Sequence, residues 1–274
     1  MTDSILDTLL AALSESEPVA LVTVVGGPGM GAKALVTPSD ILGSLGNPAL
    51  DRAVIGAARA MLRHGRTGTR RLGEHGEERE DAVEVFVQSF APPPCMYVFG
   101  AIDFSRATVR MGKLLGYHVT VCDARATFAT PKRFPEADAV VVRWPHEFLA
   151  EVSVDERTAL CVLTHDPKFD VPLLMAAVRT PAGYIGAMGS RRTHRDRMLR
   201  LREEGVDAEA LRRIRGPIGL DIGARTPEEV AVAIAAEIIA LRYGRRAIAL
   251  TEQSGPVHGD PAPGELRREE AVSA

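Results

Sequence analysis

The sequence has few cysteines, and those it has are far apart. Cys95, Cys122 and Cys161 are the only three in 274 residues, and none belongs to a Cys-x-x-Cys pair or to another metal-ligand spacing. Closely spaced cysteines are the usual sign of a structural zinc site or of a disulfide framework. Their absence predicts a chain without a metal centre and fits a reduced, cytoplasmic protein.

The sequence also lacks a basic excess and a long apolar run. Its formal net charge is -3, whereas a general nucleic-acid binder usually carries many more basic than acidic residues. There is no N-terminal apolar leader and no stretch of about 18 apolar residues free of charge. These absences argue against nucleic-acid binding, secretion and a membrane span, although clustered arginines still allow local anion sites.

The chain is long enough for one large or two moderate domains, and a proline-rich stretch marks the division. Hydrophobic residues make up 46% of the sequence, which is enough for sizeable cores. Ala91-Pro92-Pro93-Pro94 should form a stiff linker. We therefore expect one domain over residues 1–90 and a second over 95–250. Residues 252–274 contain proline, glycine and charge without apolar periodicity, which predicts a disordered tail.

The first 90 residues predict a small mixed α/β domain. Apolar residues at helical spacing predict helices from Ile5 to Leu13 and from Pro48 to Arg63. Strands are expected at 19–25, 33–37, 41–45 and 82–90, the last as an outer strand, with an exposed loop or hairpin over 67–80. The glycine-rich stretch 26–31 is either a phosphate cradle or a turn between strands. The turn is favoured because the Gly-Lys-Ser/Thr ending of a phosphate loop is missing.

Residues 95–250 predict a Rossmann-like domain with a parallel sheet, because short apolar strands alternate with helices. Strands are expected at 95–99, 117–122, 139–142, 159–163, 184–188 and 218–222, and helices at 108–115, at 173–178, after Ser190 and after Thr226. The last helix begins with the capping box Thr226-Pro227-Glu228-Glu229 and ends at Gly244. From Val230 to Leu241 it is apolar enough to be buried around most of its circumference.

The first turn of this domain departs from a dinucleotide-binding loop. Asp123 lies 23 positions after Gly100, about where a Rossmann unit places the carboxylate that binds a ribose. Pyrophosphate binding also needs the pattern Gly-x-Gly-x-x-Gly/Ala, and here Ile102 and Asp103 stand in the loop. A branched side chain and a negative charge both oppose the approach of a phosphate. NAD(P) therefore stays an alternative with a degraded loop, and Asp123 is either a ribose ligand or a carboxylate that caps a loop.

A second candidate site begins at a basic turn. Ser190, Arg191 and Arg192 open a helix with cations in its first turn, which the helix dipole disfavours. A bound phosphate would compensate, because a helix N-terminus offers free N–H groups and arginine adds paired donors. The alternative is a solvated helix start that is offset by carboxylates such as Glu203 and Glu204.

Other polar residues are expected at the same edge of the sheet, where open α/β sheets bind their ligands. His165 could donate a proton or contact a ligand, with Asp166 orienting it, or both could only satisfy loop amides. Lys168 adds a cation, and Asp221 is either a structural acceptor or a ligand-facing carboxylate. This net cationic edge suits a ligand with phosphates. The candidate cofactor-binding residues are His165, Asp166, Lys168, Ser190, Arg191, Arg192, Asp221, Gly100 and Asp123.

Three composite motifs occur in the second domain: Leu163-Thr164-His165-Asp166-Pro167-Lys168, Gly183-Tyr184-Ile185-Gly186-Ala187 with Gly189-Ser190-Arg191-Arg192, and Pro217-Ile218-Gly219-Leu220-Asp221-Ile222-Gly223 with Thr226-Pro227-Glu228-Glu229. They resemble those of the XdhC/CoxI family, whose members mature molybdenum hydroxylases such as xanthine dehydrogenase and carbon monoxide dehydrogenase. The resemblance implies a chaperone that binds the molybdenum cofactor, as molybdopterin or its cytosine dinucleotide. It also implies that the cofactor receives sulfur from a cysteine desulfurase and is inserted into an apo-hydroxylase.

The first domain departs from the family pattern where chemistry is expected. Family members usually carry Gly-Ser-x-Ser-Gly-Gly-Cys-x-Glu, whose cysteine is implicated in holding the cofactor or its sulfur. Residues 43–51 of this chain read GSLGNPALD, so Ala49 replaces the cysteine and Asp51 the acid. A methyl group neither ligates molybdenum nor carries a persulfide. The resemblance therefore implies a cofactor that is held through phosphate and pterin contacts alone.

Two other functions stay open on the sequence. An NAD(P)-dependent oxidoreductase is supported by the Rossmann pattern and by Asp123, but Ile102 and Asp103 oppose it. A non-catalytic scaffold that docks a hydroxylase is supported by the missing cysteine. Strand edges in the first domain also leave a homodimer open.

Overall fold

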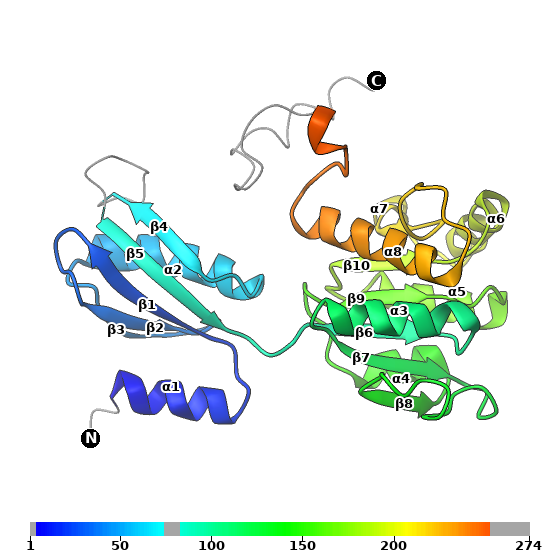
Figure 1. The fold of residues 1–274 in the computed structure, drawn as a ribbon, viewed down its shortest axis with the longest axis horizontal. Coiled ribbons are helices and arrows are strands. Elements are labelled where there is room, and N and C mark those ends of the chain that lie inside the picture. Colours follow the sequence, from blue (N-terminus) through cyan, green and yellow to red (C-terminus); the bar gives the residue numbers. More distant parts are fainter. Residues whose placement is uncertain (1–3, 74–82, 253–274) are drawn as a thin grey trace. The chain divides into compact units, whose positions relative to one another are not determined.

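The fold of the chain is taken from a computed structural model, which describes residues 4–73 and 83–252 (Figure 1). The chain divides between Pro93 and Pro94 into two units, and each unit has its own sheet. The N-terminal sheet is antiparallel and the C-terminal sheet is parallel, which confirms the predicted fold class. The predicted tail falls on residues 253–274 and so lies outside the described residues.

The N-terminal unit is a five-stranded sheet with a helix on each face. Alternate residues of one strand serve the two faces, so that Ala20 and Val22 pack with α2 while Val19 packs with α1. The strands are β1 (Val19–Gly26), β2 (Lys33–Val36), β3 (Ile41–Gly43), β4 (Gly68–Leu72) and β5 (Val83–Phe90), in the order β3-β2-β1-β5-β4, and the helices are α1 (Ile5–Ser14) and α2 (Pro48–Arg63).

Two predictions for this unit are decided by strand pairing. The glycine-rich stretch is a turn between β1 and β2, because Gly31 N donates to Val24 O at 2.9 Å and the two strands pair antiparallel. The prediction that 82–90 forms an outer strand is wrong, since β5 lies between β1 and β4. Its alternating pattern reflects burial of one face under α2. The outer strand β4 falls in the stretch expected as a loop or hairpin, of which residues 74–80 lie outside the described part.

The C-terminal unit is a six-stranded parallel sheet covered on both faces. Its order, β11-β10-β9-β6-β7-β8, is that of a Rossmann fold, with the direction of winding reversed between β6 and β9. Helices α3 and α8 pack on one face, and α4, α5, α6 and α7 pack on the other (Figure 1). The strands are β6 (Cys95–Phe99), β7 (His118–Asp123), β8 (Ala139–Val142), β9 (Ala159–Val162), β10 (Tyr184–Ala187) and β11 (Ile214–Arg215), and the helices are α3 (Asp103–Leu114), α4 (Pro145–Glu151), α5 (Pro167–Ala177), α6 (Arg191–Glu203), α7 (Ala208–Arg212) and α8 (Pro227–Arg242), followed by the 3₁₀ turn η1 (Leu250–Glu252).

The strand predicted at 218–222 is a loop. Ile218 N still donates to Ala187 O of β10, but Leu220 N then donates to Ala233 O of α8, so the backbone leaves the sheet for the helix. The last strand is β11 instead. Helix α3 begins at Asp103, five residues before the predicted start, and α8 exposes Val232 and Ile239 on its outer side, so it is less buried than predicted.

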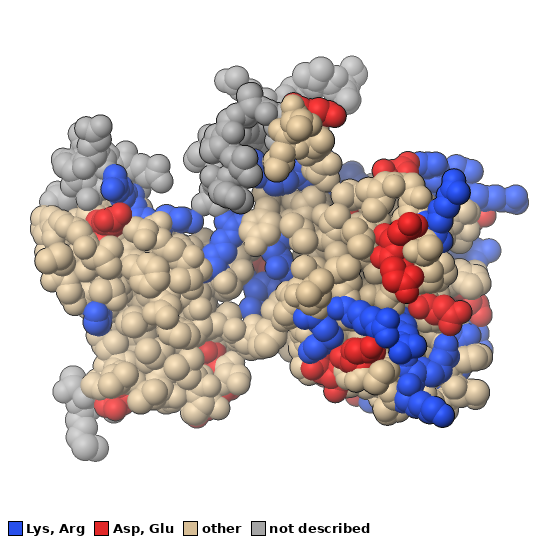
Figure 2. Space-filling view, in the orientation of Figure 1, with Lys and Arg blue, Asp and Glu red and all other residues tan. Residues whose placement is uncertain are grey.

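Charges of both signs alternate over the C-terminal unit in the face shown in Figure 2. Two ion pairs join α3 to the segment before β8: Arg110 with Glu136 at 2.8 Å, and Lys113 with Asp138 at 2.7 Å. Among the described residues, none of the helices is both long and apolar enough to cross a membrane.

Candidate functional site

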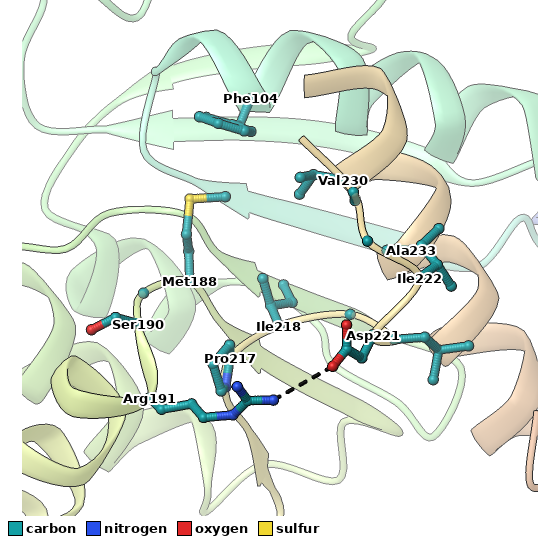
Figure 3. A pocket seen from close by; sticks show the side chains of 15 residues that line it. Phe104, Met188, Ser190, Arg191, Pro217, Ile218, Asp221, Ile222, Val230 and Ala233 are labelled. Atoms are coloured by element: carbon teal, nitrogen blue, oxygen red, sulfur yellow. Dashed lines mark hydrogen bonds and ion pairs between the residues drawn. The ribbon is translucent and has the colours of Figure 1, made fainter. Parts of the chain in front are cut away.

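A cleft of about 630 Å³ opens at the carboxyl end of β10 (Figure 3). It lies between the start of α6, the loop 217–224 and the first turns of α3 and α8. Carboxyl ends of strands are where open α/β sheets bind ligands, which makes this cleft the candidate site. Its lining consists of Phe104, Met188, Gly189, Ser190, Arg191, Pro217, Ile218, Gly219, Leu220, Asp221, Ile222, Gly223, Ala224, Val230 and Ala233.

One wall of the cleft is the N-terminus of α6. Ser190 is the N-cap residue, and its Oγ accepts a hydrogen bond from Thr193 N at 3.0 Å. This bond fixes where the helix begins and leaves the N–H groups of the two preceding helical residues without an intrahelical acceptor. Arg191, the first helical residue, also lines the cleft. The wall therefore presents backbone donors and a guanidinium together, a combination suited to an anion.

The opposite wall is the loop 217–224, which is fastened to α8 by a carboxylate. Glu237 Oε2 accepts hydrogen bonds from Tyr184 Oη at 2.5 Å and from Gly219 N at 2.9 Å. Burial, together with the neighbouring Cys161 and the Glu237 carboxylate, raises the pKa of Tyr184 well above its ordinary value, so the phenol stays protonated and donates. Sequence reasoning missed Glu237, although a single acidic residue within the apolar stretch 230–241 was a usable signal.

The cleft is divided into an apolar part and a charged part. Phe104, Met188 and Val230 lie together on one side, while Arg191 and Asp221 face each other on the other (Figure 3). These two are the only charged residues among the fifteen that line the cleft. Arg191 Nη2 lies 3.5 Å from Asp221 Oδ2, and the side chains are 80% and 86% exposed. The cleft can thus accept a ligand that has a flat apolar part and an anionic group.

A buried ion pair supports the floor of the cleft from the other face of the sheet. Arg197 Nη2 donates to Asp170 Oδ2 at 2.7 Å and to Met188 O at 2.8 Å, and Thr164 Oγ1 donates to Asp170. Arg197 and Asp170 are only 4% and 2% exposed. The network joins α5, α6 and the ends of β9 and β10, and it holds the backbone of a lining residue in place.

The structure places the predicted residues in three groups. Ser190, Arg191 and Asp221 line the cleft, whereas Arg192 is exposed on α6 outside it.

His165, Asp166 and Lys168 follow β9 at the same edge of the sheet but do not line the cleft. All three are exposed. Asp166 is the N-cap residue of α5 and accepts from Lys168 N at 3.0 Å. Lys168 Nζ lies 4.9 Å from the centre of the Trp144 ring. This geometry supports the structural role of Asp166, and His165 is not among the residues that line the cleft with Arg191.

Gly100 and Asp123 belong to a turn that satisfies its own donors. Asp123 is 3% exposed, and its carboxylate accepts from Ala101 N at 2.7 Å and from the guanidinium of Arg125 at 2.7 Å. Ile102 N points to Ser105 Oγ at 3.4 Å. The amides of Ala101 and Ile102 are thus engaged internally, and Asp103 adds a carboxylate to the first turn of α3. The residues present do not fit an NAD(P) pyrophosphate at this turn.

Asp123 gives a prediction about pH. Burial by itself would raise the pKa of this carboxyl, but the hydrogen bonds from Arg125 and Ala101 outweigh burial and hold the pKa below the ordinary 3.8. When the pKa of a carboxyl is lower in the folded protein than in the unfolded chain, the carboxyl stabilises the fold at every pH above its unfolded-state pKa. This contribution is lost as the pH falls through the folded-state pKa. Asp123→Asn should cost about 1–3 kcal/mol at pH 7, because hydrogen bonds to a charged group are lost.

The measurement is urea unfolding of wild type and Asp123→Asn at pH 7, 5 and 3. The difference in unfolding free energy should be equal at pH 7 and 5 and smaller at pH 3. Asp103→Asn, in the same turn but with a side chain 91% exposed, is the control and should stay within about 0.5 kcal/mol of wild type. A difference that grows toward low pH would contradict the assigned role.

The loop 43–51 of the N-terminal unit is closed by its own hydrogen bonds. Asp51 accepts from Leu45 N and from Ser44 Oγ, both at 2.7 Å, and Asn47 Oδ1 accepts from Ala49 N at 2.8 Å. Asp51 is thus an early-helix carboxylate that ties the loop to α2. Among the described residues, no group of three histidine, cysteine or acidic side chains could hold a metal ion.

Comparison with known proteins adds a family and several relatives. A family model described as the XdhC Rossmann domain matches residues 96–238, and one described as the XdhC and CoxI family matches residues 12–73. The chain is 28% identical over 249 residues to the uncharacterized protein YqeB of Escherichia coli, covering 86% of this chain and 46% of YqeB. It is 29% identical over 163 residues to a probable xanthine dehydrogenase subunit of Bacillus subtilis, covering 60% of this chain and 47% of that one.

A third relative is the molybdenum cofactor insertion chaperone PaoD of Escherichia coli, 29% identical over 157 residues, covering 57% of this chain and 43% of PaoD. The chain therefore spans about half the length of the curated relatives it matches. A crystal structure of a xanthine dehydrogenase from Bacillus halodurans has a similar fold, with a TM-score of 0.51 and 18% identity over 93% of this chain and 98% of that one. At this identity, the likeness concerns the fold alone.

Proposed function

Because this chain belongs to the XdhC and CoxI family, we propose that it is an accessory factor that binds the molybdenum cofactor and assists its sulfuration and insertion into a molybdenum hydroxylase. Two relatives support this role, since one is named a molybdenum cofactor insertion chaperone and the other a probable xanthine dehydrogenase subunit. We propose that the enzyme that receives the cofactor is of the xanthine or carbon monoxide dehydrogenase type, and that the chain acts in the cytoplasm.

The lining of the cleft is the observation that carries the proposal. A pterin cofactor combines a flat ring system with a phosphate, as molybdopterin or as its cytosine dinucleotide. Phe104, Met188 and Val230 offer an apolar side for the rings. Ser190, Arg191 and the first amides of α6 offer donors for a phosphate. The residues present thus fit the organic part of the cofactor.

The donor set also limits what the chain contributes to sulfur chemistry. No cysteine lines the cleft, and Ala49 occupies the position of the family cysteine in the N-terminal loop. A thiolate is the group that would ligate molybdenum or carry a persulfide. We therefore propose that this chain holds the cofactor by its pterin and phosphate, while a cysteine desulfurase supplies the sulfur directly.

Calorimetric titration under anoxic conditions tests the proposal. The ligands are molybdopterin cofactor, its cytosine dinucleotide form and NADPH, each titrated into wild type, Arg191→Ala and Arg192→Ala. Loss of a guanidinium that binds phosphate should weaken the pterin ligand about tenfold, which is the lower end of what a charge-assisted hydrogen bond contributes. Arg192→Ala removes the same charge from the neighbouring position outside the cleft, so it should change the dissociation constant less than about twofold.

Each of the remaining outcomes would indicate a different function. Binding of NADPH alone would contradict the proposal and favour an oxidoreductase, in spite of the closed turn at Gly100. If wild type binds none of the three ligands, a scaffold that docks the hydroxylase without touching the cofactor becomes the better account. In that case, a pull-down with the apo-hydroxylase should recover the complex without any pterin.

A further inference from the structure

On the charged side of the cleft, the Asp221 carboxylate lies where it can compete with an anionic ligand for Arg191. Arg191 is the only cation among the lining residues, and in the free protein Asp221 lies 3.5 Å from it (Figure 3). The two residues come from different walls, α6 and the loop 217–224. A ligand phosphate that uses Nη2 of Arg191 must therefore compete with the Asp221 carboxylate for it.

We propose that Asp221 is an internal gate that controls access of the ligand's anionic group to Arg191. The inference rests on the proposed function, since it assumes that an anionic ligand enters this cleft. In the free protein the Asp221 carboxylate is paired with Nη2 of the Arg191 guanidinium. When the ligand binds, the carboxylate turns into solvent, and when the ligand leaves, it returns.

The gate can open without unfolding its wall. Glu237 fastens the loop at Gly219 N, two residues before Asp221, and the Asp221 side chain is 86% exposed. Release of Asp221 from Arg191 therefore needs only a side-chain rotation, while the loop keeps its hydrogen bonds to α8. Such rotations of exposed side chains are fast compared with ligand exchange.

The size of the effect follows from the exposure of the pair. Exposed ion pairs favour the closed over the open arrangement by roughly two- to fivefold. Arg191 is then available for about a third to a sixth of the time, and the apparent dissociation constant is raised about three- to sixfold by that fraction. The competition from Asp221 is weak enough to permit binding, and after release it opposes rebinding of the ligand. Both properties suit a protein that must pass its ligand to a second protein.

Calorimetry with inorganic pyrophosphate and with molybdopterin cofactor tests the gate at low ionic strength. The proteins are wild type, Asp221→Asn, Arg191→Ala and the double variant. Asp221→Asn should bind both probes about three- to sixfold more tightly than wild type, and the gain should disappear in the Arg191→Ala background. Glu228→Gln is the matched control, because it removes the same charge from an exposed residue in the first turn of α8 outside the cleft.

The outcomes separate this inference from the proposed function. If wild type binds the cofactor but Asp221→Asn binds it equally or more weakly, the gate is wrong and the proposed function stands. A weaker affinity for the cofactor with no change for pyrophosphate would mean that Asp221 contacts the ring system instead. A similar gain in Glu228→Gln, or in the Arg191→Ala background, would show a general charge effect and also overturn the gate. If neither probe binds wild type or Asp221→Asn, both proposals fail.

Discussion

Replacing Arg197 with methionine should destabilise the C-terminal unit by about 3 kcal/mol. The substitution leaves the buried carboxylate of Asp170 without its cation and frees the carbonyl of Met188. Removal of one partner of a buried ion pair typically costs about 3–5 kcal/mol. The lower end is expected because Nη1 of Arg197 has no hydrogen-bond partner within the described chain, so its removal relieves an unsatisfied group.

Urea unfolding followed by tryptophan fluorescence measures this effect in the right unit. Trp144 is the only tryptophan of the chain, and its ring centre lies 5.1 Å from that of Phe169 on α5, next to Asp170. Arg195→Met, an exposed arginine of the same helix, is the control and should stay within about 0.5 kcal/mol of wild type. Equal stability of the Arg195 and Arg197 variants would show that the buried pair contributes nothing.

A double variant separates the ion pair from simple packing. Arg197→Met with Asp170→Leu removes both charges, so no uncompensated carboxylate stays buried. Replacement of a buried pair by apolar residues of similar size is often neutral, so the double variant should regain most of the lost stability. If it is instead less stable than Arg197→Met, the hydrogen bond from Thr164 to Asp170 matters more than the pair.

The sequence predicts the elements whose ends carry local signals. The helix Pro48–Arg63 is confirmed at both ends, with Asn47 as its N-cap residue and proline at its first position. Helix α8 begins as predicted, with the capping box of Thr226 and Glu229. The family predicted from the motifs is confirmed by both family models. In each case the informative residues are close together in the sequence.

Features that depend on distant contacts could not be predicted in the same way. Alternation of Ile218, Leu220 and Ile222 is typical of a strand, but the bonds that decide the conformation come from α8. Arg197 is one of many basic residues in a polar helix, and its burial depends on Asp170, 27 residues earlier. In neither case does the local sequence pattern include the residues that make the deciding contact.

The same division applies to the candidate site. The sequence groups Ser190, Arg191 and Asp221 because they follow predicted strand ends, and the structure brings these three together around one cleft. It groups His165 and Lys168 with them for the same reason. They lie at the same edge of the sheet, yet neither lines the cleft, and Lys168 lies on α5 next to Trp144. Strand ends predict the edge of the sheet, whereas the helices decide which residues share a cavity.

Gly219→Ala should both destabilise the C-terminal unit and weaken ligand binding in the cleft. Gly219 has a φ of +91°, which costs a residue with a Cβ atom about 1–2 kcal/mol. The added Cβ would also lie 3.1 Å from Ala233 and from Ile234 N, so the loop must move away from α8. Overpacking of this kind costs about 1–3 kcal/mol. The total expected loss is about 2–5 kcal/mol.

Gly205→Ala separates the two causes. Gly205 lies between α6 and α7, outside the lining of the cleft, with a φ of +85°, and a Cβ there would meet no atom within 4 Å. This variant should lose only the backbone contribution of about 1–2 kcal/mol and keep its ligand affinity within a few fold. Urea unfolding and titration with pyrophosphate measure both quantities. Gly219 N donates the hydrogen bond to Glu237 that fastens the loop to α8, so a shift at Gly219 disturbs this bond. Loss of affinity in Gly219→Ala alone would therefore show that binding depends on close packing of the loop on α8. Equal behaviour of the two variants would show that the wall does not depend on that contact.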